Sequence, residues 1–197
     1  MTTHEQIELL FQENNGIVKT SQVLDLGIAK ATFYAYAKQQ GVEQAAHGVY
    51  ISPDAWLDAM YLLHLRCTQA VFSHESALFF HDLTDREPNP YTITVKTGYN
   101  PSQLTADGIK VYTIKKNLHG IGIVTMKTPF GNPVSVYNAE RTICDLIRSR
   151  RGIEIQTLQD ALKQYIKGKD KDLQKLMHYA QIFHVENTLR PYLEVLL

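Results

Sequence analysis

Cysteine is scarce in this sequence of 197 residues, which contains only Cys67 and Cys144. The two residues lie far apart in apolar surroundings, and no CxxC pair occurs. This pattern excludes a disulfide-stapled scaffold and a cysteine-based zinc site, and it predicts buried, reduced thiols. We therefore expect a cytoplasmic protein with neither a disulfide nor a bound metal.

Long apolar runs are also missing from the sequence. No stretch reaches the roughly 20 residues that span a membrane. Residues 1–15 mix acidic and amide side chains with apolar ones, unlike a signal peptide. Apolar residues make up 44% of the chain and charged residues 20%, which is typical of a globular protein. We expect one or two folded domains and no membrane partner.

Net charge is absent as well, because 20 basic residues balance 20 acidic ones, but the distribution is uneven. Residues 1–52 carry a net charge of −2 and residues 53–109 carry −4, whereas residues 110–175 carry +7. A basic segment of this kind is typical of proteins with an anionic partner such as nucleic acid. A solvated helical face that ends in lysines explains it equally well.

The first 52 residues predict three helices and a hairpin. Thr3 is expected to cap the first helix, with Gln6 completing a capping box. Short helices are expected at residues 21–26 and 29–40, joined by a turn at Gly27, with a hairpin around Gly48. This order is typical of a winged helix-turn-helix, whose second helix enters a DNA major groove. We therefore predict a DNA-binding domain over residues 1–52.

The helix at residues 29–40 has an apolar face that includes Phe33, Tyr36 and Ala37. Its opposite face suits DNA: lysines neutralise phosphates, hydroxyls donate hydrogen bonds, and small side chains approach a thymine methyl. The candidate contacts in the first domain are Ser21, Lys30, Ala31, Thr32, Tyr34, Ala35, Lys38 and His47. The alternative is that these are merely exposed residues of an ordinary three-helix unit.

Residues 53–197 are predicted to form a second, mixed domain. A helix over residues 55–67 places Trp56 on an apolar stripe, and a further helix is expected to start at Ser73. Alternating patterns predict four strands, at residues 91–95, 109–114, 121–126 and 133–137. Helices are expected to follow them. The expected fold class is α+β, an N-terminal winged helix-turn-helix plus a C-terminal mixed domain with a small β-sheet and several helices.

The basic segment supplies further candidate phosphate contacts. Arg148, Arg150 and Arg151 lie at the expected end of a helix, where they suit either helix-end carbonyls or a phosphate backbone. Lys115 and Lys116 form a second basic pair. All five are included in the predicted DNA interface, because a net negative first domain needs additional phosphate neutralisation.

Three stretches of the chain resemble a known family. They are residues 16–34 with Gly41 and the HGVY of residues 47–50, then FSHESAL at residues 72–78 with residues 83–85, then VYNAERTICD at residues 136–145. These motifs are similar to those of AbiEi-type antitoxins from bacterial abortive-infection, type IV toxin–antitoxin systems. The resemblance covers most of residues 16–148. It departs in the wing, where family members often carry Arg or Lys and this chain has Ala45, Ala46 and His47.

The resemblance implies a protein with two functions. The winged helix would repress transcription of its own operon by binding inverted repeats in double-stranded promoter DNA. The second domain, residues 53–197, would act as antitoxin against a nucleotidyltransferase-like toxin, a functional antagonist with which no stable complex is expected. The resemblance thus implies a regulator of phage resistance that is not an enzyme.

Several polar residues of the second domain have both a catalytic and a structural interpretation. His74, Glu75 and Ser76 follow Ser73, but neighbours on a helix point in different directions, so helix start and packing are expected instead. His64, His74 and His81 lack metal-site spacing, and no phosphate-loop or dinucleotide motif occurs, so no cofactor is predicted.

A second structural interpretation concerns Arg141 and Asp145, one helical turn apart, which predict an intrahelical ion pair. The rival hypothesis for the whole chain is a nuclease-like or transferase-like enzyme that the winged helix delivers to DNA. A cluster of carboxylates converging on a metal would distinguish it.

Overall fold

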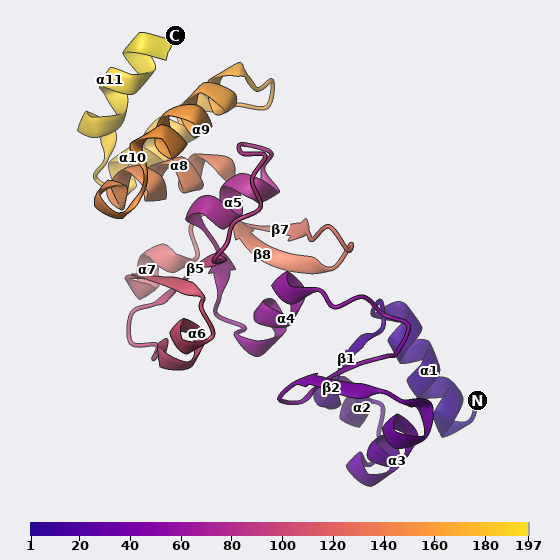
Figure 1. Ribbon diagram of the computed structural model, residues 1–197. Coiled ribbons are helices and arrows are strands. Elements are labelled where there is room, and N and C mark those ends of the chain that lie inside the picture. Colours follow the sequence, from indigo (N-terminus) through magenta and orange to yellow (C-terminus); the bar gives the residue numbers. More distant parts are fainter. Residues whose placement is uncertain (197) are drawn as a thin grey trace. The chain divides into compact units, whose positions relative to one another are not determined.

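The computed structural model describes residues 1–196 and has the expected α+β class, with two small sheets (Figure 1). The chain forms two compact units. The first contains Met1–Thr68 and Lys127–Pro133, and the second contains Gln69–Met126 and Val134–Leu197. The predicted boundary at Ser52 therefore lies inside the first unit. None of the helices in residues 1–196 has the length and apolar character needed to cross a bilayer.

The first unit contains four helices and a three-stranded antiparallel sheet. The strand order is β1-β3-β2, so β3 lies in the centre, paired with β1 on one side and with β2 on the other. The elements are α1 (Thr3–Glu13), β1 (Ile17–Lys19), α2 (Thr20–Asp25), α3 (Lys30–Gln40), β2 (Glu43–Ala46), β3 (Val49–Ile51) and α4 (Ala59–Arg66).

The core of this unit confirms the predicted helical faces. Ile7 and Phe11 of α1 pack with Val23 of α2 and with Phe33 and Tyr36 of α3. The predicted start of α1 was one residue late. The N-cap is Thr2, whose side chain accepts from Glu5 N, and the Glu5 side chain accepts from the Thr2 N–H in return.

The segment after β3 differs from the prediction. The helix expected over residues 55–67 begins only at Ala59, and Trp56, placed on its apolar stripe, is 79% exposed. The reason is Asp58, whose carboxylate accepts from Tyr61 N and caps the helix there. Residues before an N-cap have no helical periodicity, so Trp56 follows no inward stripe.

The second unit contains a five-stranded mixed sheet of order β6-β5-β4-β8-β7. β5 and β6 are parallel, β4 and β8 are parallel, and β4 and β5 are antiparallel. The strands are β4 (Val71–Phe72), β5 (Thr92–Lys96), β6 (Lys110–Ile114), β7 (Ile123–Lys127) and β8 (Pro133–Tyr137). The predicted strands are confirmed to within two residues at each end, and β4 was not predicted.

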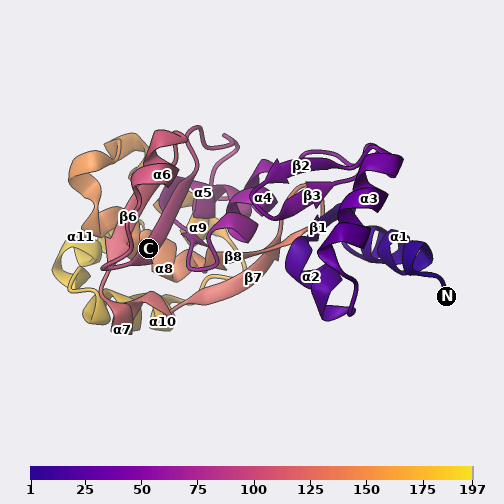
Figure 2. The same ribbon diagram turned by 90° about the horizontal axis from the view of Figure 1, so that it is seen from below.

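Helix α8 (Ala139–Arg148) contacts four other helices of the second unit, α5 (His74–Phe80), α9 (Ile155–Lys167), α10 (Leu173–Ile182) and α11 (Glu186–Leu196) (Figures 1 and 2). α8 is buried almost along its length. Both cysteines of the chain are buried and free, as predicted. The other helices are α6 (Ser102–Ala106) and α7 (Lys116–His119), with a short 3-10 turn at Arg150–Gly152.

Candidate nucleic-acid interface

A tight turn connects α2 to α3. Gly27 adopts φ +77, a left-handed conformation that favours glycine, and its N–H donates to Leu24 O at 2.8 Å. Ile28 is buried in the core, and its N–H donates to Val23 O at 3.3 Å. Ala29 is the N-cap of α3. One glycine and one buried anchor therefore fix the direction in which α3 leaves α2.

The two faces of α3 are sharply different in exposure. Phe33, Tyr36 and Ala37 are buried, as their spacing predicts. Every residue predicted for the outer face is exposed, namely Lys30, Ala31, Thr32, Tyr34, Ala35 and Lys38. The outer face is therefore a free surface with small side chains at its middle and a lysine near each end, and the positive N-terminal end of the helix dipole adds to Lys30.

Tyr34 has an aromatic neighbour that the sequence analysis missed. It is 46% exposed, and its ring centroid lies 6.0 Å from that of Tyr50 on β3. Tyr50 in turn contacts Phe33 edge to face at 4.9 Å. Burial, and then Tyr34, raise the pKa of Tyr50, so its phenol stays protonated at neutral pH. The only sequence signal for this pair was the alternation of the hairpin.

The hairpin lies beside the start of α2. Thr20 N–H donates to Gly48 O at 2.9 Å, which joins the β2–β3 turn to the helix whose first turn holds Ser21. Ser21 and His47 are both exposed. The hairpin itself carries no lysine or arginine. A basic residue near this end of the first unit is instead Lys19, the N-cap of α2.

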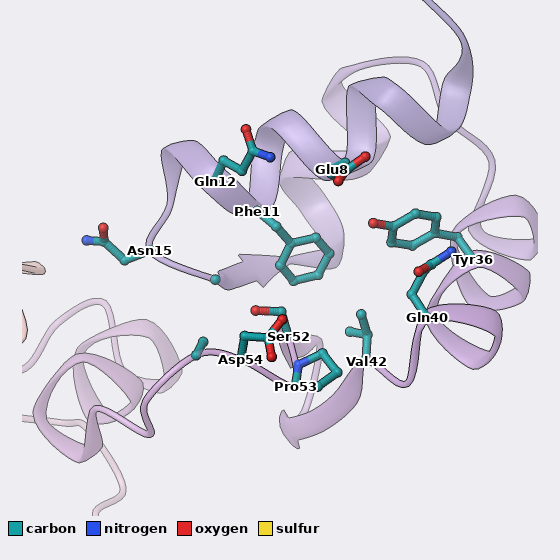
Figure 3. Close-up of a pocket in the computed structure, with 12 residues that line it drawn as sticks. Glu8, Phe11, Gln12, Asn15, Tyr36, Gln40, Val42, Ser52, Pro53 and Asp54 are labelled. Atoms are coloured by element: carbon teal, nitrogen blue, oxygen red, sulfur yellow. The ribbon is translucent and has the colours of Figure 1, made fainter.

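A polar cavity lies on the inner side of α3 (Figure 3). Tyr36 and Gln40 reach it from α3, Glu8 reaches it from α1, and Asp54 follows β3. Its charged lining residues are the two carboxylates, and none of the described residues that line it is Lys or Arg. This charge disfavours phosphate, so a nucleic-acid partner suits the outer face of α3 and not this cavity.

The basic candidates of the second unit do not form one cluster of arginines. Arg148 Nη2 lies 3.4 Å from Asp145 Oδ1, while Arg150 Nη1 donates to Thr188 Oγ1 of α11 at 3.2 Å. Arg151 is exposed in the 3-10 turn. Arg148 and Arg150 thus have side-chain partners and not helix-end carbonyls.

Arg148 and Lys115, however, both line one cavity, whose lining also includes residues of β6, the end of α8 and the α10–α11 turn. Lys116 is exposed in the first turn of α7. Among the five predicted basic contacts, the structure therefore brings only Lys115 and Arg148 to a common cavity.

His74 has a buried polar environment that its sequence position did not reveal. Ser73 is the N-cap of α5, as predicted, but its hydroxyl makes no cap and lies 3.0 Å from His74 Nδ1. His74 Nε2 lies 3.0 Å from Ser149 Oγ, and its ring stacks on Tyr112 at 3.6 Å. Burial, followed by nearby Arg148, holds the pKa of His74 well below its ordinary value. His74 is therefore neutral at physiological pH.

His74 and His81, which together with His64 lack metal-site spacing in the sequence, have separate hydrogen-bond partners. His81 Nε2 contacts Tyr137 O at 2.8 Å, whereas His64 lies in the first unit. Across residues 1–196, no three His, Cys, Asp or Glu side chains are grouped as metal ligands would be. The carboxylate cluster that would distinguish the enzyme hypothesis is therefore not found in that part of the chain.

The predicted ion pair within α8 is confirmed. Arg141 Nε donates to Asp145 Oδ2 at 2.9 Å, and both side chains are fully buried. Arg141 Nη1 also donates to Leu118 O and Ile121 O at 3.0 and 2.9 Å. These bonds join α8 to the α7 region, which is a structural role for a charged residue in the core.

The fold has a counterpart among solved structures. The RV2827C protein from Mycobacterium tuberculosis is similar over 92% of this chain and 72% of its own length, with a TM-score of 0.59 and 13% sequence identity. At this identity the likeness shows the fold alone. No protein-family model and no curated protein matches the chain.

Proposed function

We propose that the first unit contains a winged helix-turn-helix that binds double-stranded DNA, with α3 as the recognition helix and the β2–β3 hairpin as the wing. The observation that carries this proposal is the exposed outer face of α3, presented after a turn of only a few residues. Such a helix fits a major groove when small and hydrogen-bonding side chains occupy its middle.

Each outer-face residue has a proposed role. Lys30 and Lys38 neutralise phosphates, and Thr32 and Tyr34 donate hydrogen bonds to base edges or backbone. Ala31 and Ala35 let the helix approach the bases closely. Ser21 and His47 contact the backbone on either side of the groove.

The wider function we propose is that of an antitoxin that represses its own operon. The support is the resemblance to AbiEi-type antitoxins in the motifs of both units, together with the exposed helix. Two copies would occupy inverted repeats in the promoter. The second unit would counteract a nucleotidyltransferase-like toxin without a stable complex, in the cytoplasm and without enzymatic activity of its own.

The test is a titration of labelled DNA from upstream of the gene, beside a scrambled duplex at the same salt. We expect specific binding in two steps, and Lys30→Ala with Lys38→Ala should weaken it about tenfold or more, because two phosphate contacts per copy are lost. The control is Lys167→Ala with Lys169→Ala, which removes the same charge from exposed positions of the second unit. Equal affinities of both double variants would remove α3 from the proposed interface.

A further inference from the structure

The cavity shared by Lys115 and Arg148 lies wholly within the second unit. Its volume is about 630 Å³, which is in the range of small-molecule sites. Its lining includes residues Val111 to Ile114 of strand β6 and Ile182 and Phe183 from the end of α10. None of the described residues that line it is Asp or Glu, whereas two are a lysine and an arginine. Its charge therefore favours an anionic ligand.

Arg148 is held in position for such a ligand. Its guanidinium lies 3.4 Å from Asp145, which is fully buried and also accepts from Arg141 at 2.9 Å. Two guanidinium groups thus share one carboxylate, so the group of three keeps a net positive charge. The Arg141 side chain is fully buried and that of Arg148 is 28% exposed, so the accessible part of that charge lies on Arg148 at the cavity.

A chain of buried hydrogen bonds leads to the same cavity. Thr94 Oγ1 donates to Ser73 Oγ at 2.8 Å, and Ser73 Oγ lies 3.0 Å from His74 Nδ1. A neutral imidazole has one N–H and one acceptor nitrogen. Because Ser73 Oγ already accepts from Thr94, its own hydroxyl hydrogen is the one available to His74 Nδ1, so the ring proton lies on Nε2. Nδ1 is then the acceptor of the Ser73 hydroxyl.

This arrangement assigns a direction to the hydrogen bond between His74 and Ser149. Its Oγ lies 3.0 Å from His74 Nε2 and accepts from that N–H, so its own hydroxyl hydrogen is left to donate. Ser149 lines the cavity next to Arg148. A hydroxyl donor, a guanidinium and an ammonium group on one concave surface are the groups that bind the oxygens of a phosphate.

We propose that this cavity binds the phosphate of a nucleotide-sized phosphate monoester, with the phosphate at Arg148, Lys115 and Ser149 and the remainder against the apolar wall formed by Leu118, Ile182 and Phe183. The apolar wall favours a planar base over a hydroxyl-rich sugar phosphate. The proposal is independent of DNA binding by α3, and it leaves Lys116, Arg150 and Arg151 as the flanking DNA contacts.

The experiment is calorimetric titration of the full chain with each of the four nucleoside 5′-monophosphates, with inorganic phosphate and with the corresponding nucleosides. We expect at least one nucleotide to bind, its nucleoside not to bind, and inorganic phosphate to bind more weakly. Ser149→Ala and Lys115→Ala should each weaken nucleotide binding about tenfold, because each removes a hydrogen bond to a charged group. Lys167→Ala, an exposed lysine outside the cavity, is the matched control, and circular dichroism verifies folding.

Three results would overturn the proposal. The first is that no nucleotide binds at millimolar concentration, and the second is that the cavity variants bind as the parent chain does. The third is that Ser149→Ala and Lys115→Ala weaken only duplex DNA binding, which would assign the cavity to the DNA backbone. The Lys30 and Lys38 variants report on α3 separately, so the two proposals fail in different measurements.

Discussion

At the scale of single residues, Asp58 holds together parts of the first unit that lie far apart in sequence. Its buried carboxylate accepts from Thr128 Oγ1 at 2.6 Å, from Asn132 Nδ2 at 2.8 Å and from Tyr61 N at 3.0 Å. Asp58→Ala would leave these donors unsatisfied, so we expect a loss of about 3 kcal/mol in the free energy of unfolding, measured in urea. Asp58→Asn keeps an acceptor and should lose less. Equal losses would show that the acceptor is unimportant.

The second prediction at this scale concerns His74. Its pKa is lowered by burial and by Arg148, so below about pH 6.5 the unfolded chain binds a proton that the folded chain does not. Stability contributed by this group is present above pH 6.5 and is lost on acidification, by at most about 1.4 kcal/mol per pH unit.

The measurement is urea unfolding of the parent chain and of His74→Asn across this pH range. Asparagine tolerates the φ of +50 at this position but does not titrate. Because His64 and His119 also have lowered pKa values, the parent loses stability through all three and the variant through two. Identical pH slopes would contradict the prediction.

At the scale of elements, segments with periodic apolar residues could be predicted from the sequence, whereas the two-residue strand β4 could not. The three helices before Gly41 and the strands β5, β6 and β8 follow from apolar spacing. β4 has two residues, Val71 and Phe72, and exists because β5 and β8 pair with it on either side. A strand that is fixed by partners about 20 and 60 residues away leaves no periodic signal of its own.

The prediction at this scale concerns the outer face of α3. Ala35→Glu places a carboxylate on that exposed surface, so the free energy of unfolding should change by less than about 0.5 kcal/mol. DNA binding should fall about tenfold or more, because the new charge repels phosphates. Gln12→Glu on α1 makes the same charge change in the polar cavity on the inner side of α3 and should leave DNA affinity unchanged. An Ala35→Glu variant that binds normally would exclude this face.

At the scale of the whole molecule, the distribution of charge could be predicted from the sequence, but the grouping of charged residues could not. Residues 110–175 hold the excess positive charge, yet the structure gives Arg148 and Lys115 one cavity and turns Arg150 toward Thr188. The same holds for residues 127–133, which join the first unit through contacts with Asp58 some 70 positions earlier. Such contacts depend on tertiary structure that local patterns do not encode.

The last prediction follows from this charge distribution. The first 52 residues carry a net charge of −2, so strong DNA binding requires phosphate contacts elsewhere in the chain. We propose Lys116, Arg150 and Arg151, all of which are exposed. The logarithm of affinity falls with the logarithm of salt concentration by about 0.9 per neutralised phosphate. Replacing all three by alanine should therefore make the slope for one bound copy shallower by up to about 2.7.

The control for this measurement is a triple variant of Lys163, Lys167 and Lys169, which removes the same charge from other exposed positions. Its slope should match that of the parent chain, since counterion release depends on direct phosphate contacts and not on net charge. If both triple variants retain the parent slope, Lys116, Arg150 and Arg151 contact no phosphate, and with Lys115 and Arg148 assigned to the cavity the phosphate contacts come from the first unit. Lys30 and Lys38, aided by the N-terminal dipole of α3, would then have to account for the whole electrostatic part of the affinity.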